Sequence, residues 1–73
     1  MKTEKKFFMK KSQKDFDEEI LDYLIADCGC DKQTAEKELS EAFSDGWTLF
    51  QNPKTTICIQ TDYDRVEVKI RTL

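Results

Sequence analysis

Apolar residues recur at helical spacing in the first half of the chain and at alternating spacing in the second half. From Asp15 to Cys28, residues placed about 100° apart put the apolar side chains on one broad face and several acidic ones behind it. The apolar face holds Phe16, Ile20, Leu21, Tyr23, Leu24, Ile25 and Cys28. Ser12 is suited to cap this helix and Gly29 to stop it, so a helix is predicted between them.

A second amphipathic helix is predicted directly after the first. Asp31 is a good N-cap, and Gly46 supplies the left-handed stop. The core-facing positions follow an i, i+4, i+7, i+8 pattern and are Ala35, Leu39, Ala42 and Phe43. Because only residues 28–31 separate the two helices, we expect a compact corner or an antiparallel hairpin.

Three strands are predicted after Gly46. Residues 47–51 are rich in strand formers, residues 55–61 alternate about Ile57 and Ile59, and residues 66–70 alternate between apolar and charged side chains. Turn residues at 52–54 and 62–64 separate them. The pattern indicates an antiparallel meander with one solvated face, and only the two helices can cover the other face.

The first fourteen residues allow two interpretations. They form either a mobile basic tail or, over residues 6–10, a short edge strand with one phenylalanine facing inward. The fold class is therefore α+β: a two-helix hairpin packed on a three-stranded antiparallel meander forms a single domain over 15–73. Residues 1–14 are a basic arm or an N-terminal edge strand of that domain.

The charges are strongly segregated along the chain. Of 73 residues, 37% are charged and 38% hydrophobic, and the net charge is −3. Residues 1–14 hold six lysines and one glutamate, residues 15–45 hold eleven acids and two lysines, and residues 46–73 are nearly balanced. A core this small contributes about 3–5 kcal/mol to the free energy of unfolding. A homodimer or a bound partner would add to that stability.

The side-chain chemistry points away from catalysis. The chain has no histidine, which removes the commonest general base and zinc ligand. Cys28, Cys30 and Cys58 are an odd set that fits a reducing compartment. Their spacing lacks a fourth soft ligand, so we expect no metal or cofactor and interpret Cys28 as a core residue. Without a signal peptide or a membrane-length apolar run, the protein is expected to be cytoplasmic and not membrane-bound.

The acidic rows of the two helices are the candidate partner-binding surface. A regular negative surface on a small domain can dock where a basic channel normally takes phosphates. We expect Tyr63, in a turn, to be exposed and Trp47 to be buried beneath the sheet. The candidate partner-binding residues are Asp15, Glu18, Glu19, Asp22, Glu38, Glu41, Asp45 and Tyr63.

One alternative is a transcriptional regulator that binds DNA with the help of the lysine-rich arm, residues 1–14. A helix pair followed by a β-hairpin resembles a trimmed winged-helix domain over residues 15–70, which implies that Lys32, Gln33, Thr34 and Lys37 face a groove. The acids on the same helix oppose phosphate contact. We therefore expect no direct nucleic-acid binding, but a non-enzymatic inhibitor of a larger, nucleic-acid-handling protein, of the type that phages and mobile elements encode against host defences.

Overall fold

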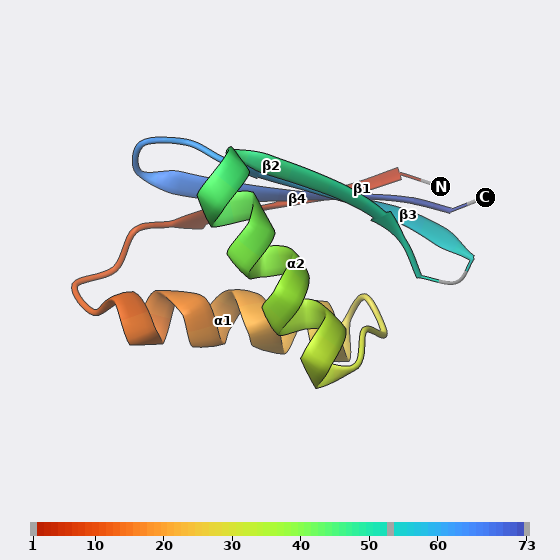
Figure 1. Ribbon diagram of the computed structural model, residues 1–73, viewed down its shortest axis with the longest axis horizontal. Helices are drawn as coiled ribbons and strands as arrows, with labels where there is room; N and C mark the ends of the chain where they lie inside the picture. The colour runs from red at the N-terminus through yellow and green to blue at the C-terminus, as the bar shows by residue number, and fades with distance from the viewer. Residues whose placement is uncertain (1, 53, 73) are drawn as a thin grey trace.

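Two helices cover one face of a four-stranded antiparallel sheet, and the other face is open (Figure 1). The computed structural model describes residues 2–52 and 54–72. The elements in chain order are β1 (Lys2–Phe8), α1 (Gln13–Ala26), α2 (Lys32–Asp45), β2 (Trp47–Gln51), β3 (Thr55–Thr61) and β4 (Arg65–Thr72). The strand order is β1-β4-β3-β2, so β1 joins the predicted three-stranded meander at its β4 edge. This confirms the α+β class and the edge-strand interpretation.

The helix ends follow from their capping residues. The Ser12 hydroxyl accepts a hydrogen bond from the Asp15 N–H at 3.4 Å, and Ser12 is the N-cap of α1. Asp31 precedes α2 in an extended conformation, and the nearby Thr34 hydroxyl lowers the pKa of its carboxyl. Gly46 ends α2 with φ +91°, and its N–H donates to the Ala42 carbonyl at 2.7 Å. Both predicted boundaries of α2 are therefore confirmed. The predicted stop of α1 at Gly29 is wrong, because α1 ends at Ala26 with Asp27 as its C-cap.

The core lies between the helices and the sheet. The buried apolar side chains come from five of the six elements and from the loop between the helices. The largest fully buried ones are Phe16, Ile20, Leu24, Ile57, Ile59, Val66 and Val68. Phe7 of β1 is also buried and meets the Tyr23 ring edge-on, with ring centroids 5.5 Å apart. Phe8 points to the opposite face, so one phenylalanine of the pair faces inward as predicted.

Several predicted burials are wrong. Trp47 is 57% exposed, because the alternation along β2 turns Thr48 toward the helices and Trp47 toward the open face. Ile25 and Phe43 are also exposed, since they lie at the margins of their helices' buried faces. Cys28 is only half-buried, and Cys30 takes the core position instead. The strand that was predicted at 6–10 runs from Lys2 to Phe8.

Neither described helix is long and apolar enough to cross a membrane.

Candidate functional site

Four acidic residues share the exposed side of α1. Asp15, Glu18, Glu19 and Asp22 are all exposed, and their i, i+3, i+4, i+7 spacing places them along one face of the helix. The Lys10 ammonium lies 3.0 Å from the Glu19 carboxylate, and both side chains are about half exposed. Such an exposed pair is weak. We call the four residues the α1 acidic surface. Among the described residues, no cation lies within ion-pair distance of Asp15, Glu18 or Asp22.

The acidic residues of α2 do not form a matching exposed row. Glu41 and Asp45 are exposed, but Glu38 is only 8% exposed and accepts a hydrogen bond from the Thr48 hydroxyl at 3.1 Å. The prediction that Glu38 lies on the surface is therefore wrong. Glu38 stands three residues after buried Ala35 and next to buried Leu39, so the side of α2 that packs on β2 includes it.

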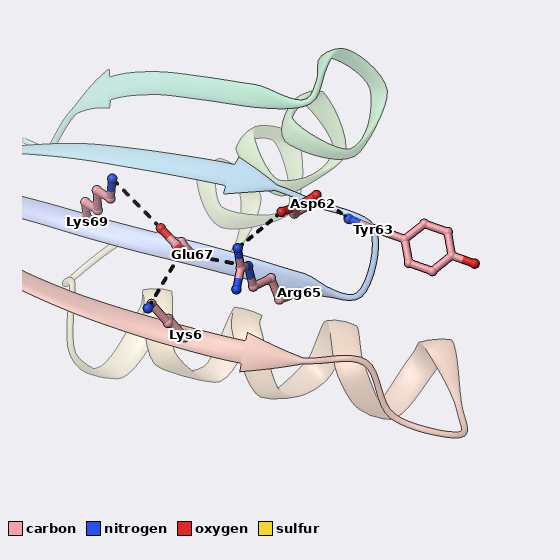
Figure 2. Close-up of polar contacts among 6 residues, drawn as sticks. All are labelled: Lys6, Asp62, Tyr63, Arg65, Glu67 and Lys69. Atoms are coloured by element: carbon pink, nitrogen blue, oxygen red, sulfur yellow. Dashed lines mark hydrogen bonds and ion pairs between the residues drawn. The ribbon is translucent and has the colours of Figure 1, made fainter.

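Tyr63 is exposed as predicted, but it lies away from the helical faces. It sits in the turn between β3 and β4, is 96% exposed, and its N–H donates to the Asp62 carboxylate at 2.7 Å. Figure 2 shows its ring pointing out beyond the end of the sheet. The eight predicted residues therefore do not form one surface. Four lie together on α1, Glu41 and Asp45 are exposed on α2, Tyr63 lies in the β3–β4 turn, and Glu38 is buried against β2.

A second charged cluster, not foreseen from the sequence, lies on the open face of the sheet. The Glu67 carboxylate is 3.9 Å from the Lys6 ammonium, 3.8 Å from the Lys69 ammonium and 4.0 Å from Arg65 Nε, so three cations surround one acid (Figure 2). Arg65 also reaches Asp62 at 3.3 Å. Lys6 and Glu67 are opposite each other in the pairing of β1 with β4, and sequence spacing alone gives no sign of that contact.

The open face also carries exposed apolar side chains. Phe8 on β1 is 59% exposed, and Trp47 and Leu49 on β2 are each 57% exposed. Trp47 and Leu49 stand two residues apart, so both point to the open face of the same edge strand. The alternation of residues 47–51 could have revealed this pair, had Thr48 been assigned to the inward face.

Two of the three cysteines lie at the corner between the helices, where Cys30 is buried and Cys28 half-buried, whereas Cys58 lies on β3. Burial, followed by the nearby Cys30 and Asp27, raises the pKa of the Cys28 thiol to about 12. Burial also raises the pKa of Cys30. Both thiols are therefore protonated near neutral pH and are poor nucleophiles. Among residues 2–52 and 54–72, no three histidine, cysteine or acidic side chains come close enough to hold a metal ion.

The structure shares with a winged-helix domain only a helix pair that is followed by strands. The described part of the chain contains two helices, whereas a winged-helix domain is built on three. Lys32, Gln33 and Lys37 are exposed on α2, beside the exposed acids Glu36 and Glu41. No protein-family model, curated protein or solved structure matches this chain. The proposal of function below therefore rests on the chain's own geometry.

Proposed function

We propose that this protein is a non-enzymatic inhibitor that binds a basic, nucleic-acid-handling surface of a larger protein through the α1 acidic surface. The observation that carries the proposal is the line of four exposed carboxylates at positions 15, 18, 19 and 22. Among the described residues, Lys10 is the one cation within ion-pair distance of this line. By type, a small acidic domain of this kind fits the inhibitors that phages and mobile elements direct against host defence.

The spacing of these charges supports the proposal. With a rise of about 1.5 Å per residue, positions 15 to 22 span roughly 10 Å of helix. Four charges over that length approach the density of one strand of a duplex, which carries one phosphate per about 3.4 Å. A protein surface built to contact a single nucleic-acid strand therefore meets a comparable row of negative groups on α1.

The α1 acidic surface is also held rigidly. Phe16, Ile20 and Leu24 on the opposite side of α1 are each no more than 1% exposed, and Phe16 packs against Phe43 of α2 with ring centroids 6.4 Å apart. Anchoring the helix in this way fixes the carboxylates before the partner arrives. Little conformational entropy is then lost on binding, which favours affinity.

The test is affinity capture of the tagged full chain from lysate with and without nuclease treatment, with identification by mass spectrometry. The variant carries Asp15→Lys, Glu18→Lys, Glu19→Lys and Asp22→Lys. A control of equal net charge reverses four exposed acids outside the candidate partner-binding residues, namely Glu4, Asp27, Glu36 and Asp64. We expect a stoichiometric protein partner that wild type and control recover and the α1 variant loses, with binding weakened by salt.

Circular dichroism of all three proteins shows whether the fold is retained. Equal recovery of the partner by the α1 variant would overturn the proposal. Recovery of nucleic acid alone, lost on nuclease treatment, would favour the DNA-binding alternative instead.

A further inference from the structure

The two edges of the sheet differ in their chemistry. On β1, four of the seven residues are charged, three of them lysines. Charged side chains of this kind, lysine above all, keep an edge strand from pairing with other chains. On β2, Trp47–Gln51, no residue is charged and none is proline. This edge therefore lacks the features by which proteins protect an exposed strand.

The backbone groups that β2 leaves unpaired follow from its register with β3. Asn52 and Thr55 exchange N–H···O bonds of 2.8 and 3.3 Å at one end of this pairing, and the Thr61 N–H donates to the Gly46 carbonyl at 2.9 Å at the other end. Hydrogen-bonded pairs alternate in an antiparallel ladder. Counting from either end, Thr48 and Phe50 bond to β3.

The backbone N–H and C=O groups of the remaining three residues, Trp47, Leu49 and Gln51, therefore point to the free edge. A strand edge of this kind can pair with a further strand. The side chains of the same three residues are exposed on the open face of the sheet, the face that neither described helix covers. A hollow lined by Asp45, Trp47, Thr48 and Leu49 lies at the start of the strand.

We propose that this edge pairs with a second copy of the same chain, β2 against β2, around a two-fold axis at Leu49. In that antiparallel register Leu49 lies opposite its own copy and Trp47 lies opposite Gln51 of the partner. Every free N–H and C=O of the three outward-pointing residues then meets one on the other strand. The strand is thus complementary to itself, as a two-fold interface requires.

Side chains and charges agree with the antiparallel register. Both copies keep Trp47 and Leu49 on the same open face, so four exposed apolar side chains gather at the seam and leave water. Exposed Asp45 flanks one end of β2 and exposed Lys54 follows the other end. Antiparallel pairing brings each of these two residues toward its opposite charge in the partner, whereas parallel pairing sets like against like.

The dimer is a single eight-stranded sheet with all four helices on one face. It does not rest on the proposed function, because the α1 acidic surface lies on the helical side and takes no part in the β2 pairing. Charge reversal on α1 and substitution on β2 therefore test two separate statements.

The test is sedimentation equilibrium of the full chain over a dilution series. Wild type is expected to show a dimer of twice the chain's 8.6 kDa that dissociates on dilution. Leu49→Lys and Leu49→Glu each place two like charges opposite each other and should abolish the dimer. An equimolar mixture of the two variants should restore it as a heterodimer, because opposite charges then face across the axis.

Thr56→Lys is the matched control, since Thr56 lies on the same open face but on the neighbouring interior strand β3. It should leave the dimer intact, and circular dichroism should report the same fold for every variant. A monomeric wild type at all concentrations, a dimer that persists in Leu49→Lys, or a mixture that stays monomeric would each overturn the proposal. A monomer that pairs through β2 with a strand of another protein would also overturn it and assign the edge to that protein.

Discussion

Glu38 shows how far a single residue's role depends on the packing around it. Its spacing to Glu41 and Asp45 fits an exposed acidic row, and the sequence offers no sign to the contrary. The rotation of α2 on β2 decides the matter, because it places the Glu38 carboxylate within hydrogen-bond reach of Thr48. Sequence periodicity locates the edges of a helix's buried face only to within about one residue. Glu38 lies at such an edge.

Thr48→Val keeps the β-branched shape of the strand residue and removes the hydroxyl that donates to Glu38. We expect a loss of about 1–3 kcal/mol in the free energy of unfolding, because a buried acceptor loses its partner. Urea unfolding followed by circular dichroism measures it. Thr56→Val, at a position on the open face of β3, should change stability much less. Equal effects of the two substitutions would show that the Glu38–Thr48 contact contributes nothing.

At the scale of elements, signals that act locally predicted the helices well. Caps at Ser12, Asp31 and Gly46 mark helix ends through the residues next to them, and the structure places the ends there. The orientation of the strands is harder to predict, because the pairing register decides which side chains face the helices. Trp47 directly follows the glycine that ends α2, and only the pairing of β2 with β3 shows which of its residues face the helices.

Gly46 permits a clean test of backbone conformation at such an end. Its φ is +91°, and a Cβ built on it would have no atom within 4 Å. Gly46→Ala should therefore destabilise by about 1 kcal/mol through the left-handed backbone alone. Gly46→Asn should lose less, since asparagine tolerates this region better. Thermal unfolding measures both; equal losses for the two variants would indicate a steric cause instead.

At the scale of the whole molecule, long-range pairing decides what the sequence leaves open. Residues 1–14 could be a tail or a strand by local pattern, because the partner of β1 is β4, at the other end of the described chain. The same distance hides the Lys6–Glu67 contact and hence the cluster on the open face. The α1 acidic surface could be predicted from helical spacing, since it needs no knowledge of any other element.

Neighbouring phenylalanines test whether β1 is part of the domain. Phe7 is 3% exposed and Phe8 is 59% exposed. Phe7→Ala should cost about 3–5 kcal/mol, which matches the whole stability expected of a core this small, about 3–5 kcal/mol, and should leave the chain largely unfolded. Phe8→Ala should change stability by no more than about 0.5 kcal/mol. Far-ultraviolet circular dichroism with urea titration distinguishes them, and a stable Phe7→Ala variant would contradict an integral β1.

The position of β4, last of the six elements along the chain and between β1 and β3 in the sheet, has a consequence for synthesis on the ribosome. As the nascent chain emerges, α2, β2 and β3 find their neighbours in chain order, but β1 has no strand to pair with until β4 appears. Loop closure across that length comes late in folding. Until β4 is available, the lysines of β1 keep this unpaired strand from pairing with other nascent chains. The same charges protect the sheet edge in the folded protein.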